Sequence, residues 1–597
     1  MPLPGIAQED FAAGSCLSIA RHLIPANGCY RIVDGLLDDD GSVYRRGGSQ
    51  YASGSVLGSG GLVFVWDGYL PAVGRRTLFA TTGKFGVLDT NDSTVIDLGN
   101  SGVSRPISPV VIGDFLYLPV AQKVYGGSRK ASSYTTGTVT ATNGWEVVTG
   151  SGTSWSANLD AGMIVSIAND ATRFYVIASV DSDTQFTLTE PFLGTTGAGQ
   201  SYTAAPFGTV STRGGRAADL YAVSAGRLLT LEGEYVRFSA GVDPTTGRLR
   251  PQIFDTTDNH RLPSGATGIA IVGLRDRALV FTTAGMWTVS NLAYDLTDAA
   301  GNVQQRFERV SELVAWGSAG IAAWENALVV PTVDGVFLVD GISRPTPVAL
   351  SIAGKISEYA RAGYRPGQAT VYRNHYVLPI VDNTNVQIDT LVCRLDRPVD
   401  TRLGRIFPWT FMDGHGAGIR GLAVRVGQTT QAPVLLAAGA DGRVLNLSAW
   451  FTPGVAFKND ADATTHDLIV ETRDFRVNPA GARNKSTVRR VRISYELTDA
   501  GSDDPTVLAY VGTGTDVGVD AAWGAVDWGA FEWGDTSLEE FVALAGQAPE
   551  AQLSTPYTWR VNRKSEWVRY RFQSSGPSSK MILRAVTSDV RRNEKTR

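Results

Sequence analysis

Two stretches of the sequence decide the fold: ALVFTTAGMWTVSNL at 278–292 and ALVVPTVDGVFLVDG at 327–341. Each contains an apolar run, a turn of Ala-Gly or Asp-Gly type, and a second apolar run, which is the pattern of a β-hairpin. The same pattern occurs five more times, at 78–89, 116–127, 220–233, 376–395 and 434–447. Hairpins of one kind, repeated along a chain, indicate a repeated β architecture.

The spacing of these hairpins indicates which architecture it is. Apart from one long gap, their starts lie about 38 to 58 residues apart, which is the spacing of four-stranded propeller blades. We therefore expect an all-β chain with a β-propeller of about six to eight blades, covering 51–134 and 205–460. The alternative is an unrelated series of hairpins in a sandwich.

The long gap contains a segment of different composition. Residues 135–204 are rich in Thr, Ser and Val and nearly free of Lys and Arg. Their alternating pattern predicts several short strands. The segment is expected to be a small β-domain inserted between two blades, at a surface loop whose ends lie close together.

The two ends of the chain do not follow the hairpin repeat. Alternating strands after the last repeat predict a C-terminal β-sandwich at 461–597. Residues 1–50 are interpreted as an extended entry segment that leads into the first blade. No stretch approaches the ~18 apolar residues of a membrane-spanning helix, and no signal-peptide pattern opens the chain, so synthesis in the cytoplasm is expected.

Charge and composition argue against two classes of protein. The 58 acidic and 54 basic side chains leave a net charge of −4, so there is no global positive field to hold nucleic acid. Sequence-specific DNA binding is therefore disfavoured. Cys16, Cys29 and Cys393 are the only cysteines, which excludes a disulfide framework.

No motif for catalysis or metal binding is recognisable. The sequence has no nucleophile elbow, zinc-protease helix motif or phosphate-binding loop, so we expect no enzyme activity, no cofactor and no metal. Asp38, Asp39 and Asp40 imitate the start of a calcium loop, but Ser49 stands where the loop needs an acid. A turn between strands is the preferred reading. A metal site built on Cys16, His22 and Cys29 lacks a fourth ligand.

An aromatic cluster stands out in the C-terminal region. Trp523, Trp528 and Trp533 lie five residues apart, each followed by Gly, in WGAVDWGAFEWGD at 523–535. They are a candidate aromatic platform for a sugar or a neighbouring subunit. The alternative is that they are three anchors in the core of the sandwich.

Charge is also segregated in this region. Residues 496–550 contain twelve acids and no Lys or Arg, whereas 551–597 contain eleven basic residues. The two blocks face each other either within one sandwich or across a subunit boundary. Candidate interface residues are Arg560, Arg563, Arg569 and Arg571.

Together, these features resemble the nozzle proteins of short-tailed bacteriophages, of the tail tubular protein B type. The similarity rests on the entry segment PANGCYRIVDGLLDDDGSVYRRGGSQYAS at 25–53, the propeller with a β-domain inserted early, and the repeated Trp near the end. It also rests on NGWEVVTGSGTSWSANLDAGMIVSI at 143–167 and SDTQFTLTEPFLGTTGAGQSY at 182–202, which resemble a small β-module of phage structural proteins. The basic step Arg45-Arg46-Gly47-Gly48 lacks the Pro often found there in that family.

The resemblance implies a mechanical function in the virion tail. In that family, six copies form a ring below the adaptor or portal, and the lumen holds and then releases double-stranded DNA without reading its sequence. Its partners would be further copies of itself, the adaptor or portal, and other tail proteins. Two alternatives stay open: a minor tail or baseplate protein of a long-tailed phage, and a host-surface carbohydrate-binding propeller.

Overall fold

The computed structural model describes most of the chain. The described residues are 6–58, 60–89, 94–212, 216–243, 247–292, 305–384, 386–402, 404–412, 418–426, 432–452, 467–476, 486–498, 506–514, 542–543, 557–565, 567–575 and 580–591. Within these ranges regular structure is almost entirely β-strand. No helix in this part of the chain is long and apolar enough to cross a membrane.

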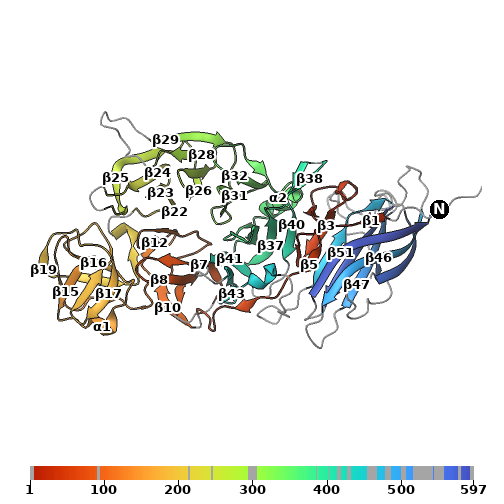
Figure 1. Ribbon diagram of the computed structural model, residues 1–597. Helices are drawn as coiled ribbons and strands as arrows, with labels where there is room; N and C mark the ends of the chain where they lie inside the picture. The colour runs from red at the N-terminus through yellow and green to blue at the C-terminus, as the bar shows by residue number, and fades with distance from the viewer. Residues whose placement is uncertain are drawn as a thin grey trace, which may run out of the picture.

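Seven sheets in the described part of the chain form a β-propeller, which lies between a small β-domain and a sandwich (Figure 1). The predicted all-β propeller class is confirmed. The first blade is β7 (Leu62–Leu70), β8 (Gly74–Thr81), β9 (Lys84–Leu88) and β10 (Val95–Asn100), the second is β11 (Val110–Ile112), β12 (Phe115–Leu118), β13 (Lys123–Tyr125) and β21 (Phe207–Thr209), and the third is β22 (Leu220–Ser224), β23 (Arg227–Glu232), β24 (Tyr235–Ala240) and β25 (Arg250–Arg261). The fourth blade is β26 (Gly268–Gly273), β27 (Ala278–Thr282), β28 (Gly285–Ser290) and β29 (Arg306–Ser311), and the fifth is β30 (Ala322–Trp324), β31 (Ala327–Thr332), β32 (Gly335–Val339) and β33 (Thr346–Pro347). The sixth blade is β34 (Arg365–Pro366), β35 (Thr370–Tyr372), β36 (His375–Val381), β37 (Gln387–Arg394) and β40 (Trp409–Met412), and the seventh is β41 (Ile419–Arg425), β42 (Val434–Gly439), β43 (Val444–Asn446) and β6 (Gln50–Tyr51).

The repeated turn chemistry explains why the hairpins form. In the fourth blade, Thr282 pairs with Gly285 across a two-residue turn, and the Thr282 hydroxyl donates to the Gly285 carbonyl at 2.9 Å. The fifth blade repeats this with Thr332 and Gly335 at 3.0 Å. Both glycines have positive φ, +119° and +152°, a backbone conformation that residues with a Cβ rarely adopt. The Thr-x-x-Gly spacing therefore specifies the hairpin locally.

The propeller ring is closed by a strand from the N-terminal region. The two-residue strand β6 pairs with β43, with Tyr51 opposite Leu445 and Gln50 opposite Asn446. The first strand of this blade, β41, packs against β7 of the first blade. The last sheet thus combines strands separated by almost 400 residues of sequence, which holds the ring shut.

The inserted domain lies within the second blade, between β13 and β21, and not between two blades as expected. Tyr125 and Phe207 pair across these strands, with ring centroids 5.3 Å apart, so the ends of the insertion are adjacent. Its sheet runs in the order β19-β14-β15-β18-β17-β16-β20. The elements are β14 (Thr138–Ala141), β15 (Val147–Ser151), α1 (Trp155–Asn158), β16 (Ile164–Ile167), β17 (Tyr175–Ser182), β18 (Gln185–Leu188), β19 (Gly197–Gln200) and β20 (Tyr202–Ala205).

The inserted domain shares part of its core with the propeller. Its own core surrounds Trp155. A second cluster joins Phe174 and Val176 of the insertion to Phe115 and Val124 of the second blade and Leu228 of the third. All five side chains are buried, so this face of the insertion is covered by propeller residues.

The sandwich contains strands from both ends of the chain. One sheet has β4 (Gly35–Leu37), β5 (Val43–Arg45), β51 (Lys580–Arg591), β46 (Ser486–Thr498) and β49 (Tyr557–Ser565), with β1 (Ile6–Gln8) on β51. The entry segment was expected at 1–50 as a separate part; its described residues, 6–50, are instead built into this domain and into the last blade. The physical reason is burial, because Ile32, Leu37 and Val43 lie in one core with Val491 and Trp559.

The second sheet of the sandwich continues the sixth blade. Its strands are β3 (Gly28–Val33), β44 (Leu468–Thr472), β50 (Trp567–Ser575), β47 (Thr506–Gly514) and β48 (Val542–Ala543), with β2 (Gly14–Ser15) and β45 (Phe475–Arg476) at the side. Val33 of β3 pairs in parallel with Phe411 of β40, and helix α2 (Ala353–Arg361) packs beside this blade. Hydrogen-bonded strands therefore run from propeller to sandwich without a linker.

Candidate functional site

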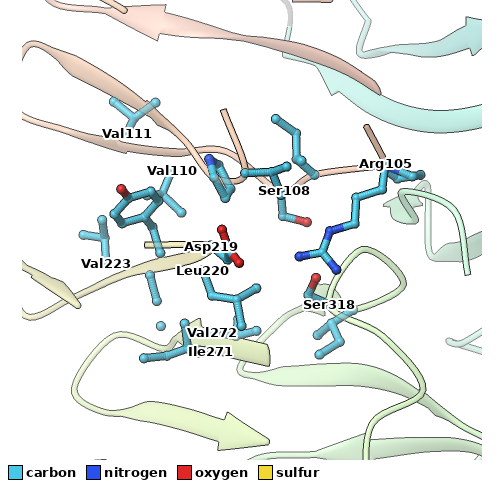
Figure 2. A pocket seen from close by; sticks show the side chains of 18 residues that line it. Arg105, Ser108, Val110, Val111, Asp219, Leu220, Val223, Ile271, Val272 and Ser318 are labelled. Carbon is cyan, nitrogen blue, oxygen red and sulfur yellow. The ribbon is translucent and has the colours of Figure 1, made fainter. Parts of the chain in front are cut away.

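A cavity of about 310 Å³ lies between the first strands of the second, third and fourth blades and the segment that precedes the fifth (Figure 2). These strands lie innermost, since β22 contacts both β11 and β26, and β41 contacts β7. The walls are aliphatic: Val110, Val111, Leu220, Val223, Ile271, Val272 and Ile321.

Four polar side chains face this space. Figure 2 shows Arg105, Ser108, Asp219 and Ser318 around its centre. Arg105 and Asp219 are exposed to it, and neither side chain has a hydrogen bond or ion pair with another described residue. Burial and the nearby Arg105 guanidinium lower the pKa of Arg365, which lies in β34 of the sixth blade. The cavity can hold a small polar molecule with an apolar body.

The lining does not offer the usual chemistry of glycoside hydrolysis. Most glycosidases need two carboxyl groups on either side of the bond that breaks. Asp219 is the only carboxylate among the described residues that line this cavity. The described lining of this cavity therefore lacks the usual pair of carboxyl groups.

Elsewhere in the ring, the Gln368 side chain links three neighbouring blades. The Gln368 amide donates to the Val65 carbonyl at 2.9 Å and accepts from the Val65 amide at 3.2 Å. It passes over Gly421, where a Cβ would lie 2.8 Å from the Gln368 oxygen. Because residue 421 of the seventh blade is glycine, the Gln368 side chain of the sixth blade can pass over it and bind the Val65 backbone of the first blade.

The acidic turn serves as a junction of ion pairs. Asp39 pairs with Arg394 and, at 3.3 Å, with Arg397 of the sixth blade, while Asp40 lies 2.7 Å from Arg584 of the sandwich. The hydrogen bond from Arg394 lowers the pKa of Asp39. The turn thus ties three parts of the fold together. The described residues contain no group of three or more possible metal ligands.

The basic step of the entry segment is buried. Arg46 donates through Nε to Asp34 at 2.6 Å, with both side chains almost completely buried. Its guanidinium also lies 4.5 Å from the Trp450 ring, and a Cβ at Gly47 would lie 2.5 Å from the Ala449 carbonyl oxygen. The motif that carries the family resemblance is therefore an internal anchor between the N-terminal segment and the last blade.

The cysteines are buried and unpaired in disulfides. Burial raises the pKa of Cys16 to about 12, and it also raises the pKa values of Cys29 and Cys393. A Gln8 amide contacts the Cys29 sulfur at 3.5 Å. Thiols held in the neutral form are poor nucleophiles and poor metal ligands.

The candidate interface arginines do not form one surface. Arg560 and Arg563 belong to β49, while Arg569 and Arg571 belong to β50 of the other sheet. Arg560 is exposed, whereas Arg569 is buried and lies 4.0 Å from Asp474. Arg571 is half-buried over the Tyr510 ring. The side chain of Arg563, the three tryptophans at 523, 528 and 533, and most of the acidic block lie outside the described residues.

A second cavity, of about 320 Å³, lies where the inserted domain meets the propeller. No sequence motif marked it, because its residues come from four separate stretches of sequence. Arg173, Thr189 and Glu190 belong to the insertion. Asp114 comes from the turn after β11, and the third blade contributes Arg248, Leu249, Arg250 and Gln252.

Glu190 in this cavity makes stability depend on pH. Burial raises its pKa to about 7, with Arg173 and Arg248 opposing the shift and Asp114 and Asp170 adding to it. The folded state thus holds this proton more tightly than the unfolded chain. We expect the free energy of unfolding to fall by up to about 3 kcal/mol as pH rises from about 4.5 to 7. Thermal unfolding of Glu190→Gln should lack this part of the pH dependence; an unchanged profile would contradict the assignment.

Comparison with known proteins identifies no family. No family model matches the sequence, and no curated protein matches it. Similar solved structures include an ancestral GH74 enzyme, YCF48 from Cyanidioschyzon merolae and a Trypanosoma rangeli sialidase mutant. Their identities are 11%, 9% and 11%, and their TM-scores 0.26, 0.29 and 0.24. The matches cover 64%, 67% and 94% of this chain, and 56%, 98% and 95% of those chains. At such low identities and TM-scores, none of them assigns an activity.

Proposed function

We propose that this chain is a structural subunit of a bacteriophage tail that assembles into a ring, expected as a hexamer, below the adaptor or portal. The observation that carries the structural reading is the continuous sheet from the sixth blade through β3 into the sandwich. Hydrogen-bonded strands that join two domains limit the motion of one against the other, which suits a part that must bear force. The assignment to a phage tail rests on the sequence resemblance.

We expect a DNA duplex to pass between subunits and not through the propeller of one chain. The Gln368 side chain is bonded to the Val65 backbone, and aliphatic side chains line the cavity between the second, third and fourth blades. A lumen for a duplex would therefore lie between subunits, which requires several copies. The net charge of −4 suits passage without tight binding, because few phosphates would be neutralised.

The outer face of the sandwich offers a surface for such contacts. Arg490 pairs in register with Arg560 on one side and with Asp589 on the other, and all three are exposed. Arg492 is exposed on the same strand. Like charges opposite each other weaken a sheet, so an acidic surface of a neighbouring subunit would relieve the repulsion between Arg490 and Arg560.

Arg560→Glu should weaken assembly and leave the fold intact. Arg560 is exposed, so its reversal is expected to change the free energy of unfolding by less than about 0.5 kcal/mol. Light scattering after size exclusion, at 0.1 M and 1 M salt, should show fewer rings for the variant and a salt-sensitive ring for the unmodified chain. Arg569→Glu is the contrasting variant, since its buried position predicts loss of folding. A ring unaffected by Arg560→Glu would exclude this surface from the interface.

Electron microscopy of virions with an antibody to this protein tests the wider proposal. Label at the tail below the portal is expected. Label on the baseplate of a long tail would favour the minor tail or baseplate alternative. Sugar-specific signal from the purified protein on a glycan array, with no protein in the tail, would favour a carbohydrate-binding propeller and overturn the proposal.

A further inference from the structure

The cavity between insertion and propeller has a rigid frame. The Gln252 side chain pairs with the Phe174 backbone in both directions, accepting at 2.7 Å and donating at 3.0 Å. Arg248 donates to the Thr189 carbonyl at 3.0 Å and lies 3.4 Å from Glu146. These contacts hold the walls in place, so the groups that line the cavity are organised before any ligand enters.

Several polar groups at this cavity lack partners within the described structure. The side chains of Asp114, Arg173 and Glu190 make no hydrogen bond or ion pair with another described residue. The Thr189 hydroxyl oxygen is buried and also has no hydrogen-bond partner among those residues. Because buried polar groups are normally paired in folded proteins, donors and acceptors gathered at one cavity suggest a polar ligand.

The charges favour an anion. Arg173, Arg248 and Arg250 line the cavity together with Asp114 and Glu190. Arg248 is engaged with Glu146 and Arg250 donates to the Gly241 carbonyl, while Asp170 is a further acid near Glu190. Protonation of Glu190 removes one negative charge and adds an O–H donor. Below neutral pH, the cavity therefore presents a free guanidinium, a carboxylic acid and a hydroxyl as donors, with Asp114 left as an acceptor.

We propose that this cavity binds a phosphate group, with Arg173 as its main ligand and the protonated Glu190 and Thr189 as further donors. A guanidinium matches two phosphate oxygens with two parallel N–H donors. A singly charged phosphate also carries a P–OH group that can donate a hydrogen bond to the Asp114 carboxylate, whereas sulfate has no such proton. The bound group would bridge the insertion and two blades.

Calorimetric titration of the full chain with inorganic phosphate tests the proposal. Binding is expected at pH 6, at least tenfold weaker at pH 8, and at least tenfold weaker for sulfate at pH 6. Glycerol phosphate separates the two sources of the group: tighter binding than inorganic phosphate would identify a phosphate ester as the natural ligand, and weaker binding would identify the free ion. Absence of binding for all three ions would overturn the proposal.

Variants test the assigned residues. Arg173→Ala and Arg173→Lys should each reduce phosphate affinity at pH 6 at least tenfold. The lysine variant keeps the positive charge but cannot donate two parallel N–H hydrogen bonds to the phosphate. Glu190→Gln should retain binding and lose most of the difference between pH 6 and pH 8. Arg275→Ala, at an exposed arginine in the turn after β26, is the matched control and should bind like the unmodified chain. Unchanged affinity in a folded Arg173→Lys variant, or sulfate binding equal to phosphate, would refute the assignment. The result is independent of whether the chain forms rings.

Discussion

Arg46→Ala is expected to destabilise the protein by about 3 to 5 kcal/mol, because it removes the guanidinium that binds the buried Asp34 carboxylate. Both side chains are nearly inaccessible, with Arg46 Nε 2.6 Å from Asp34. The variant also loses the contact with the Trp450 ring at 4.5 Å. Since Arg46 lies between the sandwich strand β5 and the closing strand β6, the loss should affect both domains.

Denaturant unfolding at neutral pH measures this effect, and Arg584→Ala provides the control. Arg584 pairs with Asp40 at 2.7 Å, but both side chains are about half exposed, so its removal should cost no more than about 1 kcal/mol. A second variant, with Asp34→Asn and Arg46→Ala together, should be less damaging than Arg46→Ala alone, because it also removes the carboxylate charge that Arg46 balances. Equal costs for Arg46→Ala and Arg584→Ala would show that burial does not govern the pair.

Deletion of residues 135–204, with a short Gly/Ser link, is expected to lower the stability of the propeller by more than about 5 kcal/mol. The sequence alone predicts a separate module that can be removed cleanly. In the structure, Phe174 and Val176 cover Phe115 and Val124 of the second blade. Exposing large apolar side chains costs about 1.5–3 kcal/mol each, and the Phe174–Gln252 pairing is lost as well.

Scanning calorimetry and binding of a hydrophobic dye are the measurements for this deletion. The matched control is Phe186→Ala, within the insertion's own core. This variant should destabilise the insertion and change the melting temperature of the propeller less than the deletion does. A deletion variant that melts like the full chain and binds no dye would show that the second and third blades close their cores unaided.

Three features could not be predicted from the sequence. Residues 45–48 are a recognisable basic, Gly-rich motif, but the burial of Arg46 against Asp34 depends on the path of the chain past Trp450. The phosphate cavity draws residues from positions 114, 173–190 and 248–252, and no local pattern connects them. The sequence does not distinguish the four candidate interface arginines, whereas in the structure the Arg560 side chain is exposed to solvent and the Arg569 side chain is buried.

By itself the sequence determined the local structure: apolar runs and Thr-x-x-Gly turns specify hairpins, because strand periodicity and turn conformation depend on residues a few positions apart. Tertiary structure alone decided how many hairpins form the ring, that β6 closes it, and that strands from 6–45 complete the sandwich. Those pairings join residues hundreds of positions apart. Their choice depends on which apolar faces and backbone groups remain unsatisfied once the hairpins have formed, and that is a property of the assembled fold.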